Sequence, residues 1–600
     1  MQFKHNSLTQ KFSIFLCLQI LLAICCVVES RAEIRKIVVT PNEQSGRIHS
    51  CLEYQITFLN EKSEVVPTQT DLEFKITDPS GKLQLFSSAD LLADNCTGDK
   101  IDGNFTIPAG QSFRRILIKS TIPIESDIYF EGVNTLVPFK EVFPVDFIYT
   151  EPASLKFLTE EANPRPGLCT KIDFGYFDEN GLPLILNSPL VVNFFPIPTP
   201  DLLFSDSACM QRVTEYEIAA GQSVGSIYTR VPPNFLDKIY IADKVRKDVM
   251  VLTALPLNYD DVGVVVNRNS AESRKIARYF VSQRNIPAQN VFYINAPTAE
   301  IISDDEFQVI RAQLEALLPA HNDPDHVINY LVTTKGLPLG IERDAHINST
   351  STSASVESEI ALLAGPHANQ IGLTRYFINP FIAQDKVFSR AEYGFFLVTR
   401  LDAYTLQGVL NLIDRSRPLT PVDVSASTSV FDRDPHWVGP GTALNYEFNL
   451  SAALMSTRGY PAELNTDTTY VTNRSNVLAY GSWGSNDHSF PWSIGPSLPM
   501  FTWVAGSIAE TYVSTSARSL MPGTPYGQSL IADLILEGVC GVKGYVFEPL
   551  TSAMARMSFV TERYTRGYNL AESFSMGSYA SLSWMEVIIG DPKMSIVPMN

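Results

Sequence analysis

Cysteine is scarce in this sequence, and its distribution is uneven. Of the eight cysteines, three lie within the first 32 residues, and four of the other five precede residue 210. No two of them show the paired C-x-x-C spacing that is typical of a zinc site. The sequence therefore predicts no metal site.

Other missing features exclude further classes of protein. The formal net charge is −18 and no basic stripe offsets it, so we expect no nucleic-acid partner. No Gly-rich phosphate loop follows the first buried strand of the C-terminal part, so we expect no cofactor. Neither Ser507 nor Ser514 lies in a G-x-S-x-G motif, which argues against a nucleophile-elbow hydrolase.

The N-terminal 32 residues have the parts of a secretory signal peptide. Lys4 and Lys11 precede a mainly apolar run over 12–28, and the small residues Ser30 and Ala32 follow it. The alternative is a retained anchor, but this run is short for a bilayer core of about 30 Å. We expect cleavage and a secreted, periplasmic or cell-surface protein, which contacts a membrane only if the segment is retained.

Residues 33–248 contain an internal repeat. The segment 51–61 aligns with 169–179 without a gap, and both alternate apolar and polar residues as half-buried strands do. The segment 105–112 likewise aligns with 216–223. Short alternating strands with frequent turn signals predict two tandem antiparallel β-sandwiches, at 33–148 and 149–248.

Each repeat contains two cysteines at matching positions. In an exported chain, the simplest pairing is one disulfide per repeat, Cys51 with Cys96 and Cys169 with Cys209. Cys540 is left over, and its apolar neighbours indicate a buried structural thiol rather than a nucleophile.

Residues 249–600 alternate between strand and helix patterns. Buried apolar runs such as 261–267 and 327–333 alternate with amphipathic segments. Ser270 is a candidate helix N-cap, and Ser303 with Glu306 forms a candidate capping box before Phe307, Ile310, Leu314 and Leu317. This order predicts one large α/β domain with a mostly parallel sheet that is covered on both faces.

Ligands bind beyond the carboxyl ends of the strands in such sheets, so the residues there are candidates for a site. The candidate catalytic residues are Lys335, Asp487, His488 and Glu548, and the candidate binding residues are Arg400, Asp402, Trp483, Asn486 and Ser507. Structural interpretations compete with these roles. A carboxylate at a sheet end, such as Glu548, needs a partner like Lys335 or Arg400, and His488 is either a general acid–base group or a loop histidine.

The same strand-end segments resemble an uncharacterised family of exported bacterial proteins that occurs in species with the exosortase sorting system. The resemblance covers about 255–597. The matching segments are Asn267, 284–287, 334–338, 399–402, 480–487, 548–549 and 590–592. The family has no established activity, so the resemblance implies kinship without implying a reaction.

A more distant resemblance is to caspase-like cysteine peptidases of the gingipain kind. These carry His-Gly at one strand end and Ala-Cys at the next, where this chain has Tyr480-Gly481 and Ala505-Gly506-Ser507. A thiol–imidazole mechanism needs both missing groups. The resemblance implies a caspase-like fold without cysteine-protease activity.

Together, these observations predict an exported envelope or surface protein whose α/β domain binds a peptide or glycan without catalysis. The alternative is a hydrolase that uses a charged pocket at the strand ends. Whether the chain is an enzyme stays open at this point.

Overall fold

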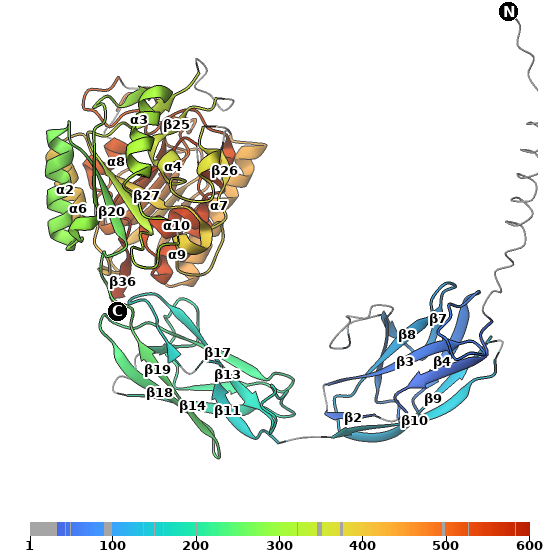
Figure 1. The fold of residues 1–600 in the computed structure, drawn as a ribbon. Helices are drawn as coiled ribbons and strands as arrows, with labels where there is room; N and C mark the ends of the chain where they lie inside the picture. The colour runs from blue at the N-terminus through green and yellow to red at the C-terminus, as the bar shows by residue number, and fades with distance from the viewer. Residues whose placement is uncertain are drawn as a thin grey trace, which may run out of the picture.

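The structure is a computed structural model of the chain. It describes residues 33–599 except 43, 48–49, 89–95, 97–98, 136, 149–150, 160, 198–201, 321, 345–350, 373–375, 495–498, 526 and 583. The expected signal peptide lies outside these residues. Two β-sandwiches precede one α/β domain in the chain (Figure 1). Among the described helices, none is long and apolar enough to cross a membrane.

The first repeat is a sandwich of two five-stranded sheets. One has the order β1 (Lys36–Thr40), β3 (Cys51–Leu59), β8 (Phe113–Lys119), β5 (Gln84–Ser88), β6 (Asp99–Ile101). The other has the order β2 (Gln44–Arg47), β10 (Lys140–Ile148), β9 (Ile124–Gly132), β4 (Leu72–Thr77), β7 (Asn104–Ile107). Every second side chain of β3 is buried, which confirms the predicted alternation.

The second repeat has the same overall topology, but one of its sheets has four strands because no described strand corresponds to β6. Its sheets have the orders β11 (Ser154–Phe157), β13 (Thr170–Phe177), β17 (Val224–Thr229), β15 (Leu203–Phe204) and β12 (Glu161–Ala162), β19 (Lys247–Thr253), β18 (Leu236–Ala242), β14 (Leu190–Ile197), β16 (Glu215–Ile218). In both repeats one short parallel pair, β2 with β10 or β12 with β19, joins otherwise antiparallel strands. The predicted tandem repeat is confirmed, although β19 continues past the predicted domain end at 248.

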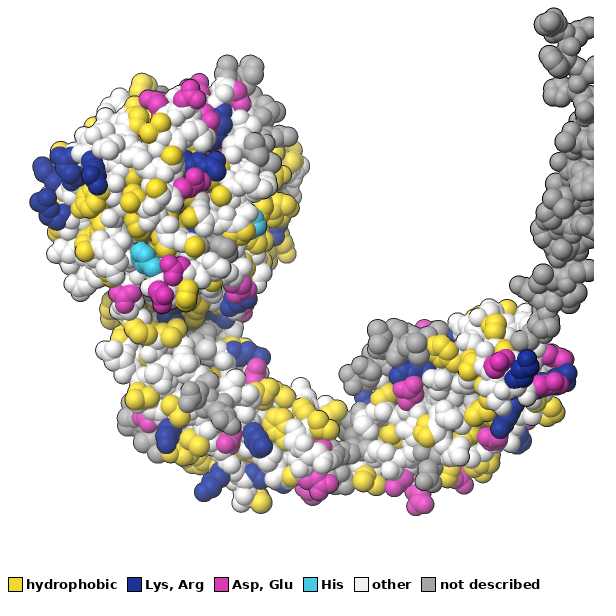
Figure 2. All heavy atoms as spheres, in the orientation of Figure 1, with side chains coloured by type: hydrophobic (Ala, Val, Ile, Leu, Met, Phe, Trp, Pro, Cys, Tyr) yellow, Lys and Arg dark blue, Asp and Glu magenta, His cyan; other side chains and the backbone are white. Residues whose placement is uncertain are grey.

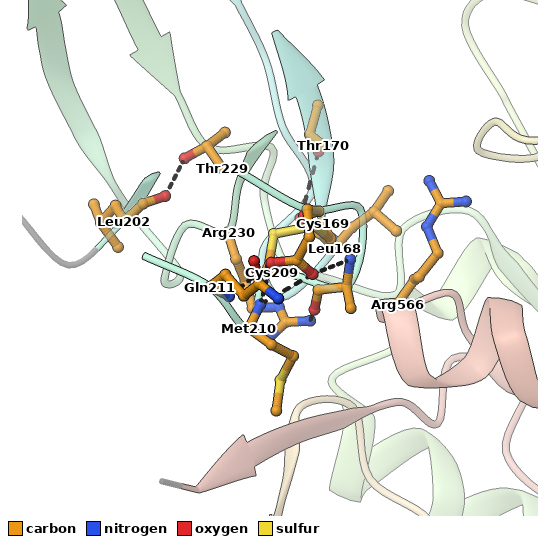
Figure 3. The surroundings of a disulfide bond; sticks show 12 residues. Leu168, Cys169, Thr170, Leu202, Cys209, Met210, Gln211, Thr229, Arg230 and Arg566 are labelled. Carbon is orange, nitrogen blue, oxygen red and sulfur yellow. Dashed lines mark hydrogen bonds between the residues drawn. A yellow bond between two sulfur atoms is a disulfide. The ribbon is translucent and has the colours of Figure 1, made fainter. Parts of the chain in front are cut away.

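Both predicted disulfides are present. Cys51 bonds Cys96 and Cys169 bonds Cys209, across sequence separations of 45 and 40 residues. Among the described cysteines, Cys540 is free and buried. Figure 3 shows the second disulfide beside Arg566, which belongs to the α/β domain.

A ten-stranded sheet forms the centre of the α/β domain. Its order is β21 (Val291–Ile294), β20 (Val262–Asn267), β23 (Tyr330–Thr334), β27 (Leu397–Leu401), β35 (Glu586–Ile589), β33 (Gly541–Tyr545), β32 (Trp503–Thr511), β31 (Val477–Ser482), β29 (Thr428–Asp432), β30 (Ala462–Asn465). Strands on each side of β35 pair in parallel with one another. β35 is antiparallel to β33 and pairs with β27 at a single position. The sheet is therefore mixed, and mostly parallel as predicted.

Helices lie on both faces of this sheet (Figure 1). They are α2 (Ala271–Arg284), α3 (Asp304–Glu315), α4 (Val356–Ile360), α5 (Arg390–Tyr393), α6 (Leu406–Arg415), α7 (Pro440–Thr457), α8 (Ile531–Glu537), α9 (Met557–Arg566) and α10 (Leu570–Gly577). Ser270 caps α2 and the Ser303–Glu306 capping box opens α3, as predicted. Leu317 is exposed, contrary to its predicted place on the apolar side, because α3 ends before it.

Shorter strands complete the domain outside the central sheet. They are β22 (Ile301–Ser303), β24 (Gly340–Glu342), β25 (Ala354–Ser355), β26 (Phe377–Ile378), β34 (Ala580–Leu582), β28 (Thr420–Asp423) and β36 (Ile596–Met599). The first three form one small sheet, and the remaining four form two strand pairs.

Ser507 does not lie beyond a strand end as predicted. The segment 505–507 resembles a turn in sequence, but β32 continues through it to Thr511. Gly506 adopts φ +78°, which an L side chain rarely adopts, and the pairing of β32 with β31 is irregular before Ile508. This irregularity lets the strand resume, so Ser507 is a fully buried strand residue.

An ion pair and a backbone hydrogen bond connect the second repeat directly to the α/β domain. Arg165 Nη1 lies 2.8 Å from a carboxylate oxygen of Glu572, whose side chain is completely buried. The backbone N–H of Cys169 donates to the carbonyl of Arg566. Gly567 approaches Gly167 so closely that a Cβ would lie 2.3 Å from the Gly167 carbonyl oxygen, so only glycine fits there.

Candidate functional site

Four charged side chains meet at the carboxyl ends of β23 and β27. Lys335 Nζ lies 3.2 Å from Asp402 Oδ1, and Arg400 Nε lies 2.9 Å from Asp402 Oδ2. Arg400 Nη1 also lies 2.9 Å from Glu357 Oε1, at the start of α4. The structure thus joins three of the predicted site residues in one network, together with Glu357.

This network is closed to solvent. Each of its four residues is at most 5% exposed. The remaining N–H groups donate inward: Arg400 to the carbonyls of Leu337 and Pro338, and Lys335 to that of Leu520. Buried charges need this degree of pairing because their desolvation is costly. The network therefore has a structural role, because it joins the ends of β23 and β27 to the loops around Leu337 and Leu520.

A second group lies after β29 and β31, which are neighbours in the sheet. Asp434 Oδ1 lies 2.8 Å from His436 Nδ1, and Asp434 Oδ2 lies 2.6 Å from His488 Nδ1. The backbone N–H groups of the same two histidines donate to the same carboxylate, at 2.9 and 3.0 Å. Asp434 is buried, whereas the side chains of His436 and His488 are 47% and 53% exposed.

Aromatic rings support this group. The His436 and His488 rings lie 4.7 Å apart, and Trp437 stacks on Trp483 with ring centroids 4.4 Å apart and planes 5° from parallel. Trp437 Nε1 donates to the carbonyl of Asn486. We call Asp434, His436, Trp437 and His488 the histidine rim.

Three buried carboxylates near the histidine rim have shifted pKa values. Burial opposes the ionisation of Asp434, but hydrogen bonds from the backbone and rings of His488 and His436 outweigh it and lower its pKa to about 2. Burial raises the pKa of Asp487 to about 6 and that of Asp432 to about 7. Asp434 therefore stays ionised, and because a carboxylate only accepts, both Nδ1 atoms carry a hydrogen.

The predicted site residues do not form one pocket. Strands β35, β33 and β32 separate β27 from β31, and four strand spacings amount to about 19 Å. Lys335, Arg400 and Asp402 belong to the buried network, whereas Trp483, Asn486, Asp487 and His488 lie at or beside the histidine rim. Glu548 is exposed, and it has no bonded partner among the described residues.

Asp434, His436 and Trp437 were not among the site residues predicted from the sequence. Nor was β29 predicted, a short strand whose end positions Asp434. The spacing Asp434-Pro435-His436 is a weak signal by itself, and nothing in the sequence indicates that it meets His488. That meeting depends on the order of the strands in the sheet.

The α/β domain carries a local basic patch, although the net charge of the chain is negative. Figure 2 shows Lys and Arg side chains gathered on the side of the α/β domain where Figure 1 places α2. Arg274, Lys275 and Arg278 of this helix are exposed, and so is Arg268 just before it. The patch is local in a chain whose formal net charge is −18.

No protein-family model and no curated protein matches the chain. Among solved structures, domains 5–6 of the S-layer protein SbsC align with 38% of this chain and 99% of their own at 11% identity, with a TM-score of 0.16. The D0–D1 domain of intimin aligns with 37% and 98% at 11% identity (TM-score 0.13). The Yersinia pseudotuberculosis adhesin InvE aligns with 39% and 62% at 10% identity (TM-score 0.13). Similarities this low assign neither fold nor function.

Proposed function

We propose that the chain is an exported surface or periplasmic protein whose caspase-like α/β domain binds a peptide or glycan at the histidine rim. Export is supported by the two disulfides, because such bonds form and persist in oxidising compartments outside the cytosol. The signal-peptide pattern before residue 33 agrees with it.

One observation carries the binding proposal: two half-exposed imidazoles are held in place by one buried carboxylate. Asp434 binds Nδ1 of both rings, and no described protein group bonds Nε2 of His436 or His488. A neutral imidazole in this tautomer presents Nε2 as a free acceptor. Preorganised polar groups beside a tryptophan are suited to bind hydroxyl or amide groups of a ligand.

The alternative hydrolase has less support. Its charged pocket required six residues to surround one substrate: Lys335, Arg400, Asp402, Asp487, His488 and Glu548. Lys335 and Arg400 are instead bonded inside the buried network, and Glu548 lies on the surface. No cysteine or histidine stands at the positions that a gingipain-like mechanism would use.

We also propose kinship with the exosortase-associated family, and the structure gives several of the matching residues a structural role. Asn267 Nδ2 donates to the carbonyls of Ala296, Pro297 and Gly336, which ties β20 to two loops. Asp591 accepts hydrogen bonds from Tyr259 and Arg284. Such residues would maintain a shared fold without implying a shared reaction.

The test is a screen on glycan and peptide arrays. It compares the unmodified chain from residue 33 with the variant Trp437→Ala. The control is Tyr446→Ala, since Tyr446 is an exposed aromatic residue on α7. We expect discrete ligands whose binding falls at least about tenfold in Trp437→Ala, a loss typical of an aromatic anchor, and persists in Tyr446→Ala.

A parallel hydrolase screen compares the unmodified chain with Glu548→Gln. We expect no turnover by either protein. Turnover that Glu548→Gln abolishes would establish the hydrolase instead, and arrays without any hit would remove the proposed ligand classes.

A further inference from the structure

The histidine rim contains a set of metal-ligating atoms that the sequence did not predict. Asp434, His436 and His488 each offer one such atom, and these atoms all lie within 4.8 Å of one another. Asp434 and His436 follow β29, whereas His488 follows β31, so two neighbouring strands fix the arrangement.

We propose that Asp434, His436 and His488 form a binding site for a divalent transition-metal ion, with Zn²⁺ as the best fit. The proposal rests on the proposed function in one respect, since both assign binding to the histidine rim. It names an ion that the rim would hold, and that ion can bind without a peptide or glycan.

The ligand types select this class of ion. Two imidazoles and one carboxylate match the three protein ligands of many zinc sites, in which a fourth position stays open. Ca²⁺ and Mg²⁺ prefer sets made of oxygen atoms alone, and Cu(I) prefers thiolate or thioether ligands. Neither preference is met here.

The geometry needs little adjustment to accept the ion. With Zn²⁺ bonds of about 2.0–2.1 Å, tetrahedral ligand atoms lie about 3.3 Å apart. The two Nδ1···O distances are now 2.8 and 2.6 Å, so small rotations of the exposed rings would open the necessary space. Metal binding at Nδ1 requires each neutral ring to carry its hydrogen on Nε2, so both imidazoles change tautomer and no net proton is released from them.

The surroundings favour a cation that solvent can reach. Both imidazoles are about half exposed, so an ion has an entry path and its open position faces water. Asp434 is held by two backbone N–H groups, which fix the carboxylate before metal binds.

A simpler role would be a clamp in which Asp434 joins the two loops by hydrogen bonds alone. A clamp and a metal site differ in one measurable respect, since a clamp binds no Zn²⁺. The experiment therefore measures metal binding directly. It uses variants of His436 and His488, whose half-exposed side chains can be replaced without opening a cavity in the core.

The full chain from residue 33 is stripped with a chelator and titrated with Zn²⁺ alone in competition with a chromogenic chelator. We expect one equivalent to bind, and binding at least about 100-fold weaker in His436→Gln and in His488→Gln, since each removes one of three ligands. The matched control is His326→Gln, whose ring contacts Asn290 outside the rim, and it should bind as the unmodified chain does. Co²⁺ should give the intense visible spectrum of a tetrahedral site in the unmodified chain and lose it in both rim variants.

Two results would overturn the proposal: no stoichiometric Zn²⁺ binding by the unmodified chain, or equal binding by the rim variants and His326→Gln. Far-ultraviolet circular dichroism of each variant establishes that it is folded before titration. Zn²⁺ binding without any array ligand would leave the metal site standing and remove the peptide or glycan function. Array binding by the chelator-treated chain, together with no Zn²⁺ binding, would leave the peptide or glycan function standing and remove the metal site.

Discussion

Glu510, near the end of β32, shows how one buried residue can make the stability of the domain depend on pH. Its side chain is completely buried, and the Tyr545 hydroxyl and the Ala555 backbone N–H donate to it. Burial raises its pKa from 4.5 to about 7, despite the opposing charge of Lys543. The folded domain therefore binds a proton here more tightly than the unfolded chain does.

We predict that Glu510 destabilises the domain as pH rises from about 4.5 to about 7. Below this window both states are protonated, and within it only the unfolded chain ionises, so the free energy of unfolding falls. The full effect is at most about 3 kcal/mol. Glu510→Gln should therefore match the parent at pH 4.5 and be more stable at pH 8, as measured by urea unfolding at each pH. An equal difference at both pH values would contradict this.

The candidate residues differ in how far sequence could predict them. Lys335 directly follows an apolar strand and Arg400 lies near the end of another, and Cys51 and Cys169 recur in matching segments, so their surroundings could be inferred. Asp434 meets His488 only because β29 and β31 are adjacent. Hydrophobic periodicity reports which strands exist, but it does not report their order in a sheet.

At the scale of elements, the buried network joins β23, β27 and α4. Arg400 makes bonds to two carboxylates and two carbonyls, whereas Lys335 makes fewer. We predict that Arg400→Met lowers the free energy of unfolding by about 3–5 kcal/mol, because it leaves the buried Glu357 without its charged partner and Asp402 with Lys335 alone. Lys335→Met should cost less, since Arg400 still pairs Asp402.

The control for these variants is Lys386→Met, which removes an exposed ion pair with Glu392 in the same domain. It should cost less than about 1 kcal/mol. Chemical denaturation of the three variants gives the order, and a cost for Arg400→Met as small as that of the control would show that the network is not a structural clamp.

Elements were predictable where the pattern was strong. The apolar runs predicted at 261–267 and 327–333 overlap β20 and β23, and the capped starts of α2 and α3 carried recognisable signals. The helix α7 was missed because Pro440 opens it without a side-chain cap and apolar residues surround much of it. Ser507 was misplaced because a glycine inside β32 resembles a turn.

At the scale of the whole molecule, Arg165 joins the second repeat to the α/β domain. Glu572 is completely buried, and it also accepts hydrogen bonds from Tyr330 and from the backbone of Phe388. Removing Arg165 would leave this carboxylate without its charged partner. We predict that Arg165→Met costs about 3–5 kcal/mol and separates the unfolding of the two domains in calorimetry.

Lys171→Met is the matched control in the same repeat, because Lys171 pairs with Asp173 on the exposed face of β13. We expect a change below about 1 kcal/mol and no separate transition. If Arg165→Met behaved like this control, the contact between the repeat and the α/β domain would not depend on the ion pair.

The bond between the Cys169 backbone and Arg566 has a mechanical consequence. A disulfide-bridged strand end of the second repeat is hydrogen-bonded directly to the last residue of helix α9. A tension applied to that repeat would therefore reach the α/β domain through this contact. The contact couples the orientation of the histidine rim to that of the second repeat.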